Sequence, residues 1–315
     1  MAVDKGRYRL GLYAAIVVSA VSLLPMFTGD TSSMAYFWTL LQFLSLVLSL
    51  NLITGFTGYI NFGHIAYYGY GAYTVAYLTT ITQLNPYLFV PAAAIGSALI
   101  ALLVGKPLLS VRGPYFTIAT LGLGEASRTI IVNLPFFNYS EGLPIAKFFK
   151  YDAFSSYISM WLVAVGLFAL TFFIKRSRYG LMLETIREDE DLAETMGIDT
   201  RRTKLAVYVL SSSTAGLVGG LTAITYVYAH PGFFSISINV AVIASLLLGG
   251  GGTLLGPVVG ATSYFIIADT LLTRFPYLHL IIFGTIIMGI SLLLPRGLVY
   301  LMYKTPKLRG LFYDA

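Results

Sequence analysis

The sequence contains no cysteine, only three histidines and few charged residues. Without cysteine the chain has no disulfides, no zinc–thiolate centre and no cysteine nucleophile, and its redox compartment is left open. His64, His230 and His279 are scattered without metal-ligand spacing, so we expect no metal site. Charged residues make up 11% of the chain, whereas a soluble domain carries about 25%. This composition excludes an ordinary soluble protein.

The sequence is instead rich in long apolar runs. Runs of about 20 residues, the length that a helix needs to cross a bilayer, recur along the whole chain. They do not alternate apolar and polar residues, which argues against a membrane β-barrel. We therefore expect an all-α polytopic membrane protein forming a single membrane domain over residues 1–315, in two related halves. The expected spans are 10–28, 34–54, 63–82, 86–105, 114–134, 157–174, 204–229, 237–250, 256–273 and 278–294.

The positive charges orient these spans. With a cytoplasmic N-terminus, 16 of the 20 Lys and Arg residues fall on the cytoplasmic side. We therefore expect both termini in the cytoplasm. The basic residues lie in loops between spans and form no separate basic domain, so a nucleic-acid partner is not expected.

A charged insert, residues 175–204, interrupts the apolar pattern with seven basic and seven acidic residues. After the Tyr179-Gly180 pair closes the preceding helix, residues 181–196 are predicted to form one helix that ends at Gly197. Its apolar residues keep partial helical spacing, which indicates a face buried against another surface. The alternative is a solvated loop anchored by basic residues. The apolar positions are Leu181, Leu183, Ile186, Leu192 and Met196.

Two glycine-rich segments, 51–71 and 249–260, break the helical pattern, one in each half of the chain. Such paired interruptions point to an internal repeat and to a translocation pathway. Broken backbone at membrane depth is tolerated only where protein or a water-filled cavity covers it. The alternative to a pathway is that the glycines allow close helix packing or tight turns. For the first segment the two interpretations are about equal. For the second segment, which falls near a membrane face, close packing or tight turns are favoured.

Polar residues within the expected spans need partners, because lipid supplies none. Glu125 and Arg128 are three residues apart, so they share a helix face and can pair. A charge at mid-membrane tends to face a cavity, although an ion pair at the outer interface is the favoured reading for Arg128. Asn51, Asn61 and His64 are also polar for a span, and a lone histidine is more often a hydrogen-bonded structural residue than a ligand.

Five segments of the chain form a recognisable series: NLITGFTGYINFGHIAYYGYGAY, VRGPYFTIATLGLGE, the insert RYGLMLETIREDEDLAETMGIDTRRTKLAVYVLSSSTAGLVGGL, LLLGGGGTLLGPVVGA and LPRGL. In this order they resemble the permeases of the branched-chain amino acid (LIV) family of ABC transporters. The second segment makes the chain more similar to the longer of the family's two permease subunits. Together the five segments extend from Asn51 to Leu298. The chain departs from the family at Ser140-Glu141-Gly142, where a glycine-rich turn is common, so the outer loop 133–157 is compatible with a binding-protein contact or with a solvated loop.

The resemblance implies an importer built from two permease subunits, two ATP-binding subunits and an extracytoplasmic binding protein in the cytoplasmic membrane. The second permease would be a copy or a relative. The chain has no G-x-x-x-x-G-K-[ST] phosphate loop, and the glycines 249–252 lack its lysine, so ATP and Mg²⁺ are expected in the partner subunit and this chain is not expected to be an enzyme.

The resemblance also implies roles for three groups of residues. The expected coupling helix to the ATP-binding subunit contains Glu184, Arg187, Glu188, Asp189, Glu190, Met196 and Gly197. Candidates for the translocation pathway are Asn51, Gly58, Asn61, Gly63, His64, Tyr115, Thr117 and Glu125. Expected hinge or close-packing residues are Gly249, Gly250, Gly252, Gly256 and Pro257.

The expected function is the ATP-driven import of leucine, isoleucine and valine. One alternative is the same architecture importing urea or a short amide. The other is a stand-alone secondary carrier or channel, which would need ion-coupling carboxylates within the membrane, and only Glu125 is well placed for that role. If the insert is a coupling helix, charge reversal at Arg187 and Asp189 is expected to uncouple ATP hydrolysis from transport.

Overall fold

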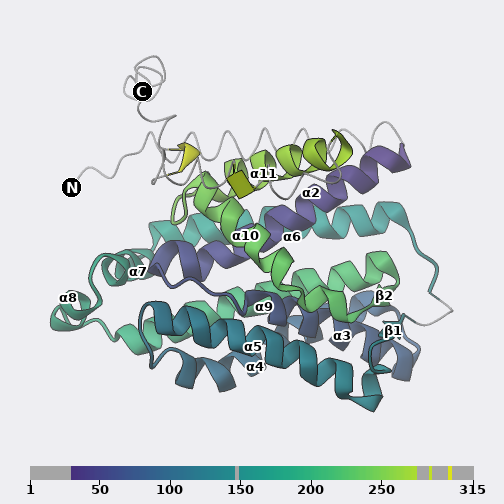
Figure 1. Ribbon diagram of the computed structural model, residues 1–315, viewed down its shortest axis with the longest axis horizontal. Helices are drawn as coiled ribbons and strands as arrows, with labels where there is room; N and C mark the ends of the chain where they lie inside the picture. The colour runs from purple at the N-terminus through teal and green to yellow at the C-terminus, as the bar shows by residue number, and fades with distance from the viewer. Residues whose placement is uncertain (1–29, 146–148, 275–283, 286–296, 300–315) are drawn as a thin grey trace.

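The computed structural model describes residues 30–145, 149–274, 284–285 and 297–299, which form a bundle of long helices (Figure 1). The long helices are α2 (Thr31–Leu50), α3 (His64–Thr82), α4 (Val90–Leu108), α5 (Pro114–Asn133), α6 (Ala153–Arg176), α9 (Thr200–Tyr226), α10 (Ile236–Gly249) and α11 (Gly256–Arg274). A π-helix, η1 (Asn51–Gly55), continues α2. The short elements are η2 (Pro86–Phe89), η3 (Pro135–Phe137), β1 (Leu143–Pro144), α7 (Arg178–Glu188), α8 (Glu190–Thr195), β2 (Tyr228–Ala229) and η4 (Pro231–Phe234).

The predicted all-α membrane class is confirmed. Eight of the ten expected spans coincide with helices, while 10–28 and, apart from residues 284–285, 278–294 lie outside the described residues. Both termini also lie outside the described part. Four helical segments are long and apolar enough to cross a membrane, and α10 is a shorter apolar helix. The four are Thr31–Gly55, Pro86–Leu108, Ala153–Arg176 and Thr200–Tyr226.

Aspartates begin several of these helices. The Asp30 carboxylate accepts hydrogen bonds from the backbone N–H groups of Ser32 and Ser33 at the start of α2. Asp152 caps α6 in the same way, and Asp199 accepts from the N–H of Arg202 at the start of α9. The first turn of a helix leaves its N–H groups without backbone acceptors, and an N-cap carboxylate satisfies them.

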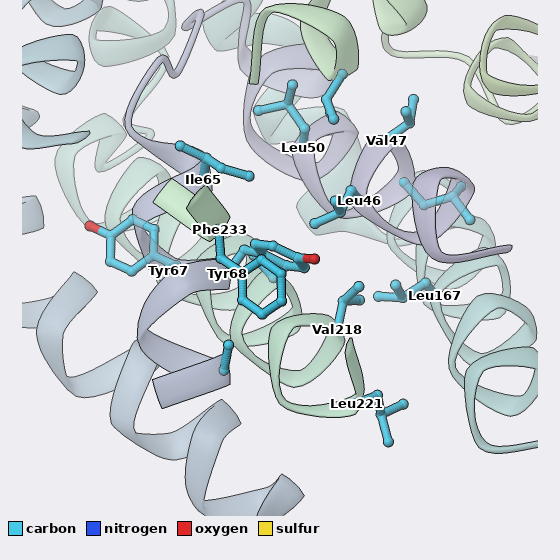
Figure 2. Packing of buried hydrophobic residues seen from close by; sticks show 14 of the residues in the cluster. Leu46, Val47, Leu50, Ile65, Tyr67, Tyr68, Leu167, Val218, Leu221 and Phe233 are labelled. Carbon is cyan, nitrogen blue, oxygen red and sulfur yellow. The ribbon is translucent and has the colours of Figure 1, made fainter. Parts of the chain in front are cut away.

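Helix α9 lies in the centre of the bundle and packs on α3 and α4. A Cβ on Gly71 would lie 1.9 Å from the carbonyl oxygen of Gly216, and one on Gly219 equally close to that of Tyr68, so α3 and α9 touch backbone to backbone. Such small-residue contacts are the usual means of close helix packing in membranes. Large apolar and aromatic side chains, including Tyr68, Val218 and Phe233, fill the space beside this contact (Figure 2).

Helix α2 is fixed to its neighbours by buried hydrogen bonds. The Ser49 hydroxyl donates to the carbonyl of Ser211 at 2.8 Å, and the Ser211 hydroxyl donates to the carbonyl of Ser49 at 2.7 Å. The Trp38 indole donates to the carbonyl of Ser156 on α6 at 3.1 Å. These bonds satisfy polar groups where lipid could not.

The bundle has two distinct ends (Figure 1). The charged insert, as α7 and α8, projects at one end, and the two short strands lie at the other. Strand β1, in the loop before α6, pairs antiparallel with β2, which follows α9, with Leu143 opposite Ala229. The Ile145 N–H extends this contact by donating to the Val227 carbonyl at 3.0 Å. The loop 133–157 is thus partly fastened to the bundle.

Candidate functional site

The insert contains two helices, not the single one predicted over residues 181–196. Helix α7 ends at Glu188, and Asp189 adopts an extended conformation with φ −157° and ψ 114°. Its carboxylate accepts hydrogen bonds from the N–H groups of Asp191 and Leu192, so it caps α8. Aspartate competes with helix continuation in this way, which is why the chain turns here. Gly197 does end the second helix, with φ +83° as expected of a glycine stop.

The start of the insert also differs from the prediction. Helix α6 ends at Arg176, and Ser177 caps α7 by accepting from the N–H of Gly180. The Tyr179-Gly180 pair therefore lies inside the first turn of α7 instead of closing the preceding helix. A Cβ on Gly180 would lie 2.2 Å from the Ile174 carbonyl oxygen, so this glycine lets α7 fold closely onto the end of α6.

Two cations hold the insert against the glycine-rich segments. The Arg187 guanidinium donates from Nη1 to the carbonyl oxygens of Gly55 at 2.7 Å and Gly251 at 3.1 Å. The Lys175 ammonium, in the last turn of α6, donates to the carbonyl of Gly252 at 2.6 Å and to Glu184 at 2.5 Å. Both cations meet carbonyls that the broken helices leave free, where positive charge is favourable.

The two glycine-rich segments meet each other at the same place. The Asn51 side chain accepts from the N–H of Gly252 at 2.9 Å. A Cβ on Gly55 would lie 2.6 Å from the Gly252 nitrogen, so only glycines fit at the crossing. We name the glycine junction as Asn51, Gly55, Gly251 and Gly252. Residues about 200 apart in sequence thus form one contact, and α7 lies directly against it.

The expected hinge or close-packing residues lie in close backbone contacts and turns. A Cβ on Gly249 would lie 1.8 Å from the Gly256 carbonyl oxygen, so α10 and the start of α11 are in backbone contact. Gly250 and Gly252 have φ of +105° and +79°, in the region that favours glycine. Pro257 is the second residue of α11, where its missing N–H costs nothing. The alternative of tight turns and close packing fits this segment.

Helix α8 is held by a buried ion pair. The Lys204 ammonium, only 2% exposed, lies 2.5 Å from Glu190 and donates to the Tyr59 hydroxyl at 3.0 Å. The Tyr59 hydroxyl in turn donates to Glu190. Burial alone would raise the pKa of the Glu190 carboxyl, but the hydrogen bonds from Lys204 and Tyr59 outweigh it and hold the pKa below its usual value. Glu190 therefore stays ionised and fixes α8 to the start of α9.

Arg112, in the loop between α4 and α5, contacts three carboxylates of α8. It lies 2.6 Å from Asp191, 3.5 Å from Glu194 and 3.6 Å from Glu190. The hydrogen bond to Asp191 raises the pKa of Arg112 above its ordinary value. The two helices of the insert thus contact different parts of the bundle: α7 contacts the glycine junction, and α8 contacts α9 and the loop before α5.

The outer face of the insert has solvent-exposed apolar side chains. Of the five apolar positions expected on a buried face, Leu183 and Ile186 are buried toward the bundle, as is Ala193, which was not among the five, whereas Leu181 is 52% exposed. Leu192 and Met196 are 54% and 69% exposed, although they lie among charged residues. Glu188 is also exposed on this face. Two apolar side chains, four residues apart, are therefore exposed on a charged, protruding segment.

A second crossing lies at the break before α3. The Asn239 amide, on α10, donates to the carbonyls of Phe62 at 2.6 Å and Asn61 at 3.3 Å. His64 is 1% exposed, and neither of its ring nitrogens has a hydrogen-bond partner within the described part of the chain, so the expectation of a hydrogen-bonded histidine is not met there. The Asn61 side chain accepts from the N–H of Gly63 at 2.9 Å.

The pathway candidates do not gather at one place. Asn51 belongs to the glycine junction, and Gly58 lies beside Arg187, whose Cγ is 3.4 Å from where a Cβ would be. The break before α3 holds Asn61, Gly63 and His64, all buried. Tyr115, Thr117 and Glu125 lie on α5, with Tyr115 73% exposed. The predicted Glu125–Arg128 ion pair is present at 4.0 Å.

Sequence reasoning missed several residues of this site. Tyr59 and Arg112 gave no signal, because a tyrosine in a tyrosine-rich segment and a basic loop residue are both common in membrane proteins. Asn239 did give one, as a single amide in the apolar run 237–250. Lys204 was visible only as a basic anchor. Among the described residues, no group of three or more His, Asp or Glu side chains is placed to hold a metal ion.

Comparison with known proteins identifies the family. Residues 33–291 match the family described as branched-chain amino acid transport system, permease component. The chain belongs to this family of permeases. It is similar to the high-affinity branched-chain amino acid transport system permease protein LivM of Escherichia coli, with 27% identity over 98% of this chain and 79% of LivM.

Other relatives are also permeases of branched-chain amino acid transport systems. The LivM protein of Salmonella typhimurium is 28% identical over 85% of this chain and 70% of its own length. A probable branched-chain amino acid transport permease protein, LivH, of Methanocaldococcus jannaschii is 29% identical over 75% of this chain and 78% of its own. No solved structure matches the chain significantly.

Proposed function

We propose that this permease is the membrane subunit of an ATP-driven importer of branched-chain amino acids. The insert docks on an ATP-binding subunit in the cytoplasm, a second permease chain completes the pathway, and an extracytoplasmic protein delivers the substrate. ATP and Mg²⁺ are bound by the partner subunit. The substrate class rests on the relatives, whose names specify branched-chain amino acid transport.

This proposal rests on one observation: the insert has an exposed outer face and an inner face that contacts the glycine junction. Its outer face exposes Leu192 and Met196 to a partner, while its inner face holds Arg187 against the glycine junction. A push on the outer face reaches the junction through one side chain and two hydrogen bonds. A stand-alone carrier would gain nothing from an exposed apolar patch on a charged protrusion.

In this mechanism, closure of the ATP-binding subunits displaces α7 and α8. Helix α7 contacts the glycine junction, where the end of α2 meets the turn between α10 and α11. Displacement of α7 therefore shifts both glycine-rich segments at once. Helix α8 carries the same displacement to α9 and, through Arg112, to the start of α5. Packed helices move as rigid bodies, so small shifts at the insert tilt whole spans.

The test is co-purification of the ATP-binding subunit with the solubilised permease. Replacing residues 184–196 with a flexible linker removes the second half of α7 and all of α8, whereas Leu192→Asp with Met196→Asp removes only two exposed apolar side chains. Both changes are expected to abolish co-purification. The control is Tyr139→Asp, an equally exposed position in the loop at the opposite end of the bundle.

A permease that purifies alone and transports without ATP would overturn the proposal in favour of a carrier. Substrate class is tested separately with the complete importer in vesicles. Uptake of leucine competed by isoleucine and valine, and not by urea or short amides, is the expected result.

A further inference from the structure

We infer that the outward face of α5 is the surface on which a helix of the second permease chain packs. This inference rests on the proposed function, which requires such a chain, and it names the surface. Helix α5 turns one face toward the bundle and the opposite face outward. The buried residues recur every three or four positions, as Phe116, Thr120, Gly124, Ser127 and Ile131. The outward residues are Tyr115, Ile118, Leu121, Gly122, Ala126, Arg128, Thr129 and Ile130, and the half-exposed Glu125 side chain lies beside them.

The outward faces of two other long helices provide a comparison. In α4 as far as Gly105, and along the middle of α6, every exposed residue is apolar, as lipid requires, and the exposed Lys106 lies in the last turn of α4. On α4, within 90–105, they are Pro91, Ile95, Leu99, Leu102 and Leu103. On α6, within 161–175, they are Leu162, Val165, Gly166 and Phe173. Helix α5 differs because the polar residues Arg128 and Thr129 are exposed along it and the Glu125 side chain beside them is 43% exposed.

The charges on α5 are only partly satisfied within the chain. Glu125 and Arg128 lie 4.0 Å apart, with side chains 43% and 50% exposed. Glu125 is about 16 Å along the helix from Pro114 at 1.5 Å per residue, close to its middle. A charge at that depth facing lipid is costly, because hydrocarbon offers it no polar partner. A protein partner that offers each charge a second polar contact removes this cost.

The shape of the face also suits a helix. A Cβ on Gly122 would find nothing within 4 Å, so this side of α5 is open. Gly122 and Ala126 are four residues apart, and small residues at that spacing let two helices approach closely. On its other side α5 is bound to the break before α3, since the Phe62 N–H donates to the Thr120 hydroxyl at 3.1 Å. A chain seated on the outward face would thus border the pathway candidates Tyr115 and Glu125.

The matched glycines Gly122 on α5 and Gly166 on α6 allow a direct test. Both are outward-facing, and a Cβ on either would meet nothing within 4 Å, so both tolerate a larger side chain. A photo-reactive phenylalanine analogue is placed at one position or the other in the full chain, within the assembled importer in its membrane. Mass spectrometry identifies the adducts. The expected result is a permease–permease adduct from position 122 and lipid adducts alone from position 166. Differently tagged copies distinguish a homodimer from a heterodimer.

A packing variant gives an independent readout. Gly122→Trp is expected to reduce the co-purified second permease about tenfold, the effect of one overpacked contact, while Gly166→Trp leaves it unchanged. The ATP-binding subunit should still co-purify with both variants, because the insert is distant from these positions. Lipid adducts alone from position 122, with the ATP-binding subunit present, would overturn this inference and leave the proposed function standing. Absence of the ATP-binding subunit from the unmodified chain would instead remove the proposed function.

Discussion

Gly55 and Gly252, almost 200 residues apart in sequence, lie so close that neither position has room for a side chain. A Cβ on Gly55 would lie 2.6 Å from the Gly252 nitrogen, and a Cβ on Gly252 would lie 2.5 Å from the Gly55 carbonyl oxygen. Arg187 donates to that same carbonyl at 2.7 Å. The crossing of the two glycine-rich segments is therefore so close that the insert can contact both through one guanidinium.

Gly55→Ala should disrupt this crossing. The added methyl group would also lie 1.9 Å from Asn51 Oδ1, so the backbone must shift. We expect a loss of about 2 kcal/mol in stability, typical of overpacking, and impaired transport. Thermal unfolding in detergent measures the first effect. Gly166→Ala, where the methyl group meets open space, is the control, and equal melting temperatures for the two variants would contradict the close crossing.

Arg187→Gln is expected to uncouple ATP hydrolysis from transport while the complex still assembles. The amide is too short and uncharged to hold the carbonyls of Gly55 and Gly251, so displacement of α7 no longer reaches the junction. Arg187→Glu should be more severe because it places a carboxylate against these carbonyls. The ratio of ATP hydrolysed to substrate imported measures the effect. Arg178→Gln, which removes an exposed cation of the same helix, should leave the ratio unchanged.

Asp189 is expected to contribute to coupling for a different reason, since it caps α8. Asp189→Ala should destabilise α8 by about 1 kcal/mol, and Asp189→Asn or Asp189→Ser should restore most of that. Protection of the α8 backbone amides in hydrogen exchange reports the change directly. If alanine and asparagine gave the same protection, the side chain would have no capping role.

The Lys204–Glu190 pair should show strong energetic coupling. Lys204→Met leaves a largely buried carboxylate without its nearest cation, and loss of one partner of a buried pair costs about 3 kcal/mol. The double variant with Glu190→Gln should be more stable than Lys204→Met alone. A double-mutant cycle on the melting temperatures measures this coupling. Additive effects would mean that Lys204 is satisfied without Glu190.

The same carboxylate predicts a pH dependence. Glu190 has a pKa held below its ordinary value of 4.5 in the folded protein, so its contribution is complete above 4.5 and is lost as the pH falls through the folded pKa. The difference in melting temperature between the wild type and Glu190→Gln should therefore be constant near neutral pH and shrink below 4.5. Glu188→Gln, at an exposed carboxylate of the insert, should show a smaller change.

The sequence predicted the helical spans well because hydrophobic length and glycine breaks are local signals. It located both glycine-rich segments and the insert, yet it gave no indication that Gly55 meets Gly252, since contacts between distant segments leave no local pattern. Asp189 was read as part of a charged helix. An acidic residue inside an acidic run does not reveal whether it will cap a new helix. Asn239 shows the opposite case, in which an isolated amide in an apolar run could have been recognised as a contact.

The strand pair at the far end has a mechanical consequence. Because β1 lies in the loop before α6 and β2 follows α9, their pairing joins that loop to the end of α9. The insert helices α7 and α8 connect α6 to α9 at the opposite end of the bundle. We expect a force applied to the insert to move α9 more at the end beside α8 than at the end that continues into β2.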